Sequence, residues 1–253
     1  MKVYLAIDFG STYTKLTAID MDNEVILATA KDITTVEEDI MIGFNKAYEK
    51  LKFAINEKVN FDSVEFVSKT ACSSAAGGLK MVAIGLVPEL TAEAAKKAAL
   101  GAGARVIKTY AYELNHRELE EIKATPLDII LLAGGTDGGN KDCIIHNAKM
   151  IAEYRLDVPV VVAGNKVAID QVEAIFNEAE IDYFVTENVM PVINKLNVEP
   201  SREEIRKVFM NRIVEAKGMK NAEEFIKGIL MPTPAAVLKA AEVLAEGTDD
   251  EDG

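Results

Sequence analysis

The pattern that most constrains the fold is an alternation of apolar strands and helices through the middle of the chain. Strand-like apolar segments at residues 105–112, 127–133, 158–163 and 181–186 are separated by helical patterns. Continuously apolar strands of this kind are typical of a parallel sheet that helices cover on both faces. Polar or glycine-rich loops follow the last three of these segments, where open α/β sheets bind their ligands. The sequence therefore predicts a parallel, Rossmann-like α/β region.

The first thirty residues show a different pattern, which predicts an antiparallel β-hairpin. Val3, Leu5 and Ile7 alternate with less buried positions, and alternation returns at residues 16–19 after a polar run. A further strand-like segment follows at residues 25–28. The turn between the first two strands contains DFGSTYTK.

Three ways of binding a phosphate can be compared with this turn. A P-loop needs GK[ST] at the start of a helix, and a Rossmann fingerprint needs GxGxxG before a helix. Here the chain re-enters a strand and has one glycine, Gly10, so neither motif fits. The third way is a tight turn whose amides and hydroxyls surround the phosphate, with Asp8 holding Mg²⁺ through water. The alternative is an ordinary hairpin with a polar turn.

Composition excludes several other classes of protein. The chain has 253 residues, 49% of them hydrophobic, and a formal net charge of −13, which argues against a nucleic-acid-binding surface. No apolar run approaches the roughly 20 residues that span a bilayer, and the first residues resemble a strand rather than a signal peptide. Two distant cysteines, Cys72 and Cys143, suit a reducing compartment. We therefore expect a cytoplasmic protein that does not bind membranes.

The turn DFGSTYTK resembles the first phosphate motif of the actin, Hsp70 and sugar-kinase superfamily. The resemblance implies an α/β fold with an actin-like, ribonuclease H-like N-terminal lobe. It also implies a role for each residue of the turn. Asp8 would be the catalytic, metal-side carboxylate for Mg²⁺, Thr14 would contribute a hydroxyl and Lys15 a charge. Backbone contacts to ATP would come from Gly10, Ser11, Thr12 and Tyr13.

Four stretches narrow the resemblance to one family: DFGSTYTKLTAID, TACSSAAGGLKMVAIGLVPELTAEAAKKAALGAGARV, LLAGGTDGGN and VVVAGN. Together they resemble the glutamate-mutase accessory family often called MutL or GlmL, which is unrelated to the mismatch-repair protein of the first name. Its members accompany adenosylcobalamin-dependent mutases and aminomutases. They are thought to be ATP-driven reactivating chaperones that expel damaged cobalamin. The resemblance implies ATP and Mg²⁺ as cofactors and such a mutase as partner.

The resemblance also suggests how the chain is organised. We expect an actin-like ATPase lobe at residues 1–125, a parallel α/β region at 126–200 and a helical segment with an acidic tail at 201–253. Family members continue into a second lobe with a second phosphate motif, which this chain does not contain, so we expect an N-terminal fragment. ATP lies between two lobes in this superfamily, so the fragment is expected to hydrolyse ATP weakly or not at all.

A second glycine-rich loop, GGTDGGN, follows the strand expected at residues 127–133. Gly134 and Gly135 permit close backbone approach, the following helix offers an N-terminus suited to an anion, and Asp137 is placed to contact a metal or a ribose hydroxyl. The loop is either part of a nucleotide site or a tight strand-to-helix turn. Asn165 and Asn188 end the next two strands and are expected at the same edge. A nucleotide and a part of the cobalamin enzyme both remain candidate occupants.

Alternative functions stay open at this point. One is a relative of the radical-dehydratase activators, whose iron–sulfur cluster requires cysteine ligands that Cys72 and Cys143 do not readily provide. Another is a small-molecule kinase of the same fold, and a third is a non-catalytic binding module. Local signals also suggest helix N-caps at Thr91 and at Ser201, the latter with Glu204 in a capping box.

Overall fold

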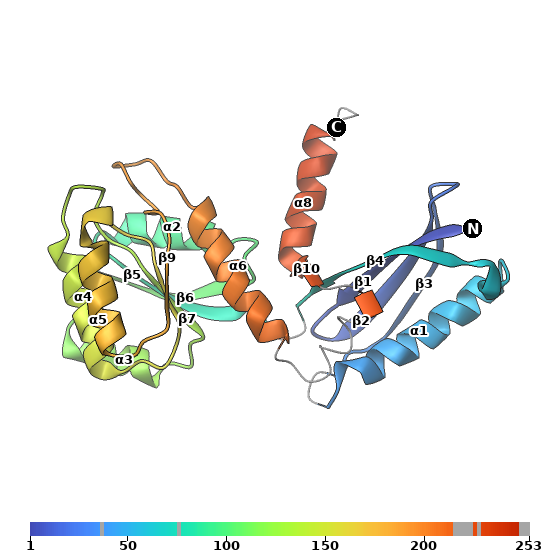
Figure 1. Cartoon of the computed structure of the whole chain (residues 1–253), viewed down its shortest axis with the longest axis horizontal. Coiled ribbons are helices and arrows are strands. Elements are labelled where there is room, and N and C mark those ends of the chain that lie inside the picture. The colour runs from blue at the N-terminus through green and yellow to red at the C-terminus, as the bar shows by residue number, and fades with distance from the viewer. Residues whose placement is uncertain (36–37, 75–76, 215–224, 227–228, 248–253) are drawn as a thin grey trace. The chain divides into compact units, whose positions relative to one another are not determined.

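A computed structural model gives the fold and describes residues 1–35, 38–74, 77–214, 225–226 and 229–247. The chain divides into two compact units. Unit 1 comprises Met1–Gly77 and Met210–Gly253, and unit 2 comprises Gly78–Phe209. Unit 2 is therefore an insertion between two segments of unit 1. Figure 1 shows that each unit has its own β-sheet and its own helices.

Unit 1 is built on a mixed five-stranded sheet with the strand order β10-β4-β1-β2-β3. β2 runs antiparallel to β1 and β3, whereas β4 runs parallel to β1 and β10 runs parallel to β4. This is the sheet expected of a ribonuclease H-like lobe, and its N-terminal antiparallel hairpin confirms that prediction. Its elements are β1 (Lys2–Phe9), β2 (Tyr13–Asp20), β3 (Val25–Ile33), α1 (Ile40–Asn56), η1 (Phe61–Ser63), β4 (Glu65–Ser73), β10 (Ile229–Pro232) and α8 (Thr233–Glu246).

Alternation along β1 decides which side chains enter the core of unit 1. The odd-numbered residues from Val3 to Phe9 are buried, and the ring of Phe9 lies 5.9 Å from that of Phe44 on α1. Because successive side chains of a strand point to opposite faces, Asp8 is directed to the other face of the sheet. There it is paired across the hairpin with Lys15.

Unit 2 contains a five-stranded sheet with the strand order β6-β5-β7-β8-β9, in which each strand runs parallel to its neighbours. Counted from the first strand of the unit, this is the order 2-1-3-4-5 of flavodoxin-like folds. The parallel α/β prediction is thus confirmed. The elements are β5 (Leu79–Gly85), α2 (Pro88–Ala99), β6 (Ala104–Ala111), α3 (His116–Ala124), β7 (Ile129–Leu132), α4 (Asp142–Tyr154), β8 (Val160–Val162), η2 (Lys166–Ala168), α5 (Ile169–Glu178), β9 (Tyr183–Val185) and α6 (Glu199–Val214), whose residues from Met210 onward belong to unit 1.

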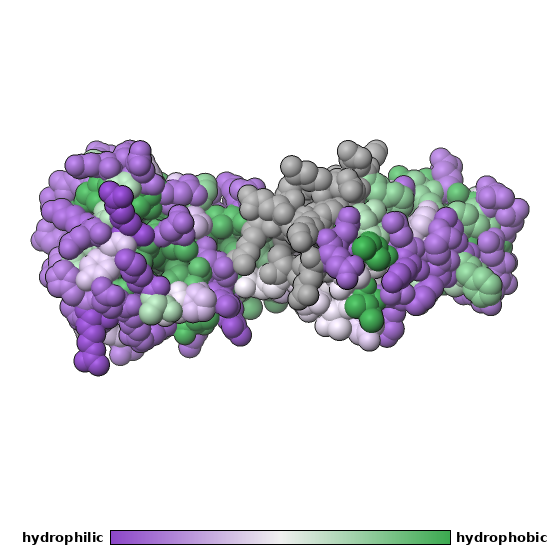
Figure 2. Space-filling model, turned by 90° about the horizontal axis from the view of Figure 1, so that it is seen from below, coloured by the Kyte–Doolittle hydropathy of each residue, from purple (hydrophilic) through white to green (hydrophobic). Residues whose placement is uncertain are grey.

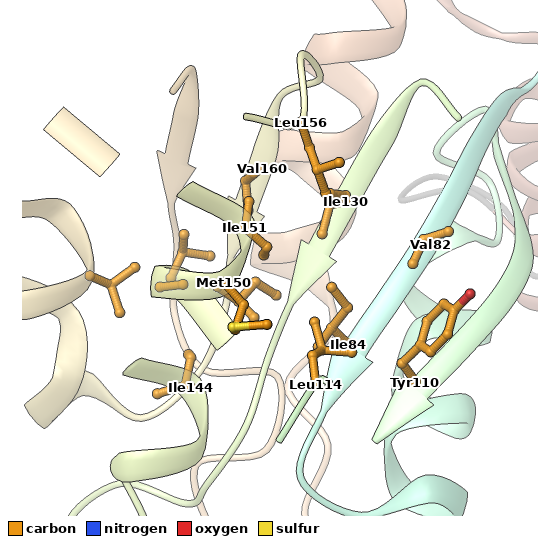
Figure 3. Close-up of a cluster of buried hydrophobic side chains, with 14 of the residues drawn as sticks. Val82, Ile84, Tyr110, Leu114, Ile130, Ile144, Met150, Ile151, Leu156 and Val160 are labelled. Atoms are coloured by element: carbon orange, nitrogen blue, oxygen red, sulfur yellow. The ribbon is translucent and has the colours of Figure 1, made fainter. Parts of the chain in front are cut away.

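The core of unit 2 lies where α4 packs against the middle strands of the sheet. Figure 3 shows Ile84 of β5, Ile130 of β7 and Val160 of β8 near Ile144 and Ile151 of α4. All five side chains are fully buried. Burying an aliphatic side chain of this size contributes about 1.5–3 kcal/mol, so this cluster is a main source of the unit's stability.

The two units do not coincide with the three expected regions. The expected boundary at residue 125 falls inside unit 2, because β5 pairs with β6 on one side and with β7 on the other. Residues 201–253 were expected to be helical, yet they also contain β10, which completes the sheet of unit 1. The acidic tail at residues 248–253 lies outside the described residues.

The two expected N-caps are wrong. Val87 is the N-cap of α2 because Pro88, whose fixed φ suits the first turn, starts the helix three residues before Thr91. Ser201 also lies inside a helix, since α6 already begins at Glu199. Both side chains are consequently buried rather than exposed at a helix end.

Hydrophilic residues are prominent on the surface. On the face seen in Figure 2, hydrophilic residues cover much of the visible surface, and hydrophobic residues form smaller patches between them. Within the residues that the structure describes, no helix is long and apolar enough to cross a bilayer.

Candidate functional site

The candidate site of unit 1 is centred on Asp8, at the carboxyl end of β1. Its carboxylate accepts a hydrogen bond from the hydroxyl of Thr233 at 2.9 Å and forms an ion pair with Lys15 at 3.2 Å. The thiol of Cys72 lies 3.6 Å from the same carboxylate. Asp8 and Cys72 lie near the ends of β1 and β4, Lys15 lies near the start of β2, and Thr233 directly follows β10, so the sheet order brings them together. The Asp8 side chain remains 24% exposed, which leaves it accessible to a ligand.

The turn that follows Asp8 is tight and presents free backbone donors. The amide of Gly10 donates to the carbonyl of Tyr13 at 3.1 Å, which closes a two-residue turn at Ser11 and Thr12. A Cβ atom at Gly10 would lie 2.7 Å from that carbonyl oxygen, so only glycine fits. Among the described residues, nothing accepts a hydrogen bond from the amides of Ser11 and Thr12. These two exposed N–H groups are the kind of donor pair that binds an anion.

Thr14 does not take the position that was expected of it. Its side chain is fully buried, and its hydroxyl lies 3.0 Å from that of Thr34. The reason is strand alternation: Thr14 is paired with Phe9, whose side chain points into the core. In this structure the Thr14 hydroxyl therefore faces the core, and the phosphate contact expected of it stays a prediction.

Two lysines lie beside the turn on the same face as Asp8. Lys15 is directly opposite Lys31 in the pairing of β2 with β3, and Lys31 also lies over the ring of Tyr13 at 5.1 Å. Like charges on facing strand positions repel each other, and an anion between them relieves that repulsion. In a chain with a net charge of −13, this is a local concentration of positive charge next to free amides.

Sequence reasoning missed Thr233 and gave Cys72 no role near Asp8. Thr233 is the first residue of α8, and the side chain of the N-cap residue Pro232 makes no hydrogen bond to the helix. The helix N-terminus therefore lies beside the carboxylate that the Thr233 hydroxyl contacts. Burial raises the pKa of the Cys72 thiol, and the negative charge of Asp8 adds to the rise. Cys72 is therefore a protonated neighbour of Asp8 at neutral pH.

The other predicted residues lie in unit 2, where they form a cross-linked loop. Gly134 and Gly135 have φ values of 144° and 70°, which a residue with a side chain rarely adopts. Asp137 accepts hydrogen bonds from the amide of Lys166 at 3.2 Å and from the side chain of Asn188 at 2.9 Å. Its carboxylate thus holds the loop to neighbouring segments.

The asparagines at the ends of β8 and β9 complete these cross-links. Asn165 is fully buried, accepts from the amides of Gly138 and Val167, and donates to two loop carbonyls, those of Gly139 and Asn140. Asn188 also donates to the carbonyl of Gly135. As expected, both asparagines lie at the GGTDGGN edge. Their polar atoms, however, are used to fix the loop.

The donor set around Asp8 fits a Mg²⁺-bound phosphate better than a metal held by protein alone. No group of three or more His, Cys, Asp or Glu side chains suited to a metal occurs among the described residues. Mg²⁺ usually takes one or two carboxylates and completes its shell with water and substrate phosphates. One accessible carboxylate beside free amides and lysines matches that mode.

Comparison with known proteins places the chain in a family. A family model described as "MutL protein" matches residues 4–253. The chain belongs to this family. The predicted membership is confirmed, and a curated relative agrees with it: "Protein MutL" of Clostridium tetanomorphum is 72% identical over all 253 residues. The chain spans 54% of the length of that MutL relative.

Two solved structures were also matched, at low similarity. The activator of 2-hydroxyisocaproyl-CoA dehydratase from Clostridium difficile, with bound ADPNP, is 13% identical, with 90% of this chain and 99% of that chain covered and a TM-score of 0.20. The ethanolamine utilization protein EutJ from Carboxydothermus hydrogenoformans is 14% identical, and the match covers 79% of this chain and 88% of EutJ with a TM-score of 0.19. At these TM-scores neither similarity supports an argument about the MutL chain.

Proposed function

We propose that this chain is the nucleotide-binding part of an ATP-dependent accessory protein that reactivates an adenosylcobalamin-dependent mutase or aminomutase. The observation that carries the nucleotide part is the arrangement at the end of β1. Asp8 stands beside a turn closed by Gly10, with Lys15 within reach and two amides that make no hydrogen bond to any described residue. The reactivating role is supported by membership of the MutL family.

The turn would bind the terminal phosphates of ATP. The amides of Ser11 and Thr12 would donate to phosphate oxygens, and Gly10 allows them to approach closely. Lys15 would exchange its partner Asp8 for a phosphate. That exchange costs little, because ion pairs between exposed side chains are worth about 0–1 kcal/mol and the Lys15 side chain is 59% exposed.

Asp8 would hold the Mg²⁺ ion that accompanies the nucleotide. Thr233 fixes the carboxylate through its hydroxyl, so Asp8 keeps its orientation when Lys15 leaves. A bound Mg–ATP supplies the phosphoanhydride bond and the charge neutralisation for its cleavage. In the superfamily that the turn resembles, ATP lies between two lobes, so we assign the proposed hydrolysis to the longer protein and expect weak binding by this chain.

Binding of Mg–ATP by the chain tests the nucleotide assignment. We expect Lys15→Met to weaken the affinity about tenfold or more, as loss of a hydrogen bond to a charged group does. The matched control is Lys50→Met, since Lys50 is 61% exposed and also pairs with a strand aspartate, Asp32. A second control is Thr14→Val, which removes a buried hydroxyl and leaves the turn intact. Equal affinities of Lys15→Met and Lys50→Met for Mg–ATP refute the assignment.

The partner is tested separately with a full-length member of the family. Glutamate mutase is first inactivated with bound cyanocobalamin and then incubated with that protein, Mg–ATP and free adenosylcobalamin. Recovery of activity that requires hydrolysable ATP is expected. Failure of Asp8→Asn to abolish this recovery contradicts the role of Asp8, whereas no recovery with the parent protein contradicts the reactivating role.

A further inference from the structure

Unit 2 has a cavity of its own that the proposed nucleotide site does not use. It has a volume of about 220 Å³ and is lined by residues that follow β5, β7 and β9. The chain leaves β5 toward β6 on one side and later returns to β7 on the other, so β5 and β7 flank the point where the strand order reverses. In open parallel sheets, ligands bind outside the carboxyl ends of the strands at this point.

The walls of the cavity are apolar. They are formed by Leu86, Val87, Leu90, Val189, Met190 and Ile193. The side chain of Ile193 is 69% exposed, and Val87 is also exposed. A ligand that covers exposed aliphatic side chains gains about 25 cal/mol of binding free energy for each Å² of apolar surface removed from water. This part of the cavity therefore favours the hydrocarbon part of a ligand.

Backbone donors lie at the polar end of the cavity. Gly134, Gly135 and Thr136 line it, and among the described residues nothing accepts a hydrogen bond from their amides. The N-terminus of α2 also borders it, with no side-chain cap on the helix. Its first free amides and its dipole favour a negatively charged acceptor. By contrast, the side chain of Asn188 is occupied by loop and backbone groups.

Thr91 provides the independent observation that this end binds a polar group. It lines the cavity from the second turn of α2, is only 8% exposed, and its hydroxyl has no hydrogen-bond partner among the described residues. The side chain lies over the end of β5, since a Cβ atom at Gly85 would be 2.3 Å from the Thr91 hydroxyl oxygen. The Thr91 hydroxyl is not one of the atoms that are buried without a partner, so it stays accessible from the cavity and is available to donate to a ligand acceptor.

We propose that this cavity binds a small aliphatic carboxylic acid. The hydrocarbon chain lies against Leu90, Met190 and Ile193, and the carboxylate accepts from Thr91 and from the amides of Gly134 to Thr136. A cavity of about 220 Å³ has room for a small acid, such as one of about five carbons. This site is separate from the Asp8 site and does not depend on nucleotide binding.

The experiment is a titration of the whole chain with sodium pentanoate, followed by NMR of the Gly134 and Gly135 amides and the Met190 methyl group. We expect saturable shifts with a Kd of about 1 mM, as suits so small a ligand. Pentanamide keeps the acceptor without the charge and should bind more weakly. Pentylammonium has the same chain and no acceptor, and should not bind at this site.

Two variants make the result specific. Thr91→Val removes only the unpartnered hydroxyl, so the fold should persist while pentanoate affinity falls about fivefold to tenfold. Ile193→Asp places a negative charge at the cavity and should weaken pentanoate more than pentanamide. Val167→Asp is the matched control, because Val167 is 56% exposed in the same unit and does not line the cavity.

Three outcomes overturn the proposal. The first is the absence of saturable shifts with pentanoate, and the second is equally tight binding of pentylammonium. The third is an unchanged pentanoate affinity in both Thr91→Val and Ile193→Asp. None of these results bears on Mg–ATP binding in unit 1, so the two proposals fail or succeed independently.

Discussion

Asn165 is predicted to be the side chain on which the GGTDGGN loop depends most. It is fully buried and makes four hydrogen bonds, at 3.0 to 3.1 Å, to two backbone amides and two backbone carbonyls. A hydrogen bond contributes about 0.5–1.5 kcal/mol net, so four of them give an upper range of about 2–6 kcal/mol. Because Gly139 and Asn140 are exposed, their carbonyls regain water in the variant. We therefore expect Asn165→Ala to lower the free energy of unfolding by about 2–4 kcal/mol.

A second substitution separates hydrogen bonding from the loss of volume. Asn165→Asp keeps the size of the side chain but replaces the donor by a carboxylate oxygen facing the carbonyls of Gly139 and Asn140. It should cost at least as much as Asn165→Ala, since an unpaired buried charge is expensive. The control is Asn177→Ala, because Asn177 is exposed and its side-chain oxygen accepts one hydrogen bond, from the Tyr183 hydroxyl, among the described residues. This control should change stability by less than about 0.5 kcal/mol.

The assay is urea unfolding followed by circular dichroism, combined with hydrogen exchange of the peptide that covers residues 129–163. The peptide reports on unit 2 alone, which matters because the chain has two units. Faster exchange throughout this peptide in Asn165→Ala, and not in Asn177→Ala, is the expected result. A loss of less than about 1 kcal/mol in Asn165→Ala would show that the four hydrogen bonds do not hold the loop.

Two further predictions follow from the same geometry. Gly135→Ala should lower the free energy of unfolding by about 3 kcal/mol or more, because its Cβ would lie 1.9 Å from the Asn140 carbonyl oxygen. Gly138→Ala places its Cβ in open space, so it should cost only the roughly 1–2 kcal/mol of a left-handed backbone. Similar urea midpoints for the two variants would contradict this prediction. Burial, assisted by the charge of Glu113, raises the pKa of Cys143 to about 11. Its thiolate fraction at pH 8 is then about 200-fold below that of a free cysteine of pKa about 8.5 and increases as the pH rises toward 11. Labelling with iodoacetamide at pH 8, followed by peptide mass spectrometry, should leave Cys143 unmodified long after free cysteine has reacted, and equal rates would refute the account.

Much of the local structure was predictable because hydrophobic periodicity depends on neighbouring residues alone. The hairpin of β1 and β2 and the buried strands β7 and β8 appear where the apolar patterns placed them. The alternation in β1 also fixes the side of the sheet on which Asp8 lies. The side on which Thr14 of β2 lies could not be read from β1 alone. It depends on the register of the hairpin, which pairs Thr14 with Phe9 and so places it in the core.

The division into units was not predictable from local patterns. β10 has four residues and pairs with Ala71, Cys72 and Ser73, which precede it by more than 150 positions. A strand that short carries no clear periodic signal, and its pairing is decided by tertiary packing. The same holds for Thr233: the sequence Pro-Thr-Pro indicates a helix start, but its position beside Asp8 depends on where β10 joins the sheet.

The most direct test of the central claim is paramagnetic broadening of amide signals by Mn–ATP bound to the ¹⁵N-labelled chain. The ion takes the position of Mg²⁺ and broadens signals near it. We predict that the amides of Ser11 and Thr12 broaden first and that Asp8→Asn removes this effect. Broadening centred on Gly134 to Gly139, or none at any amide, would contradict a nucleotide site at the end of β1.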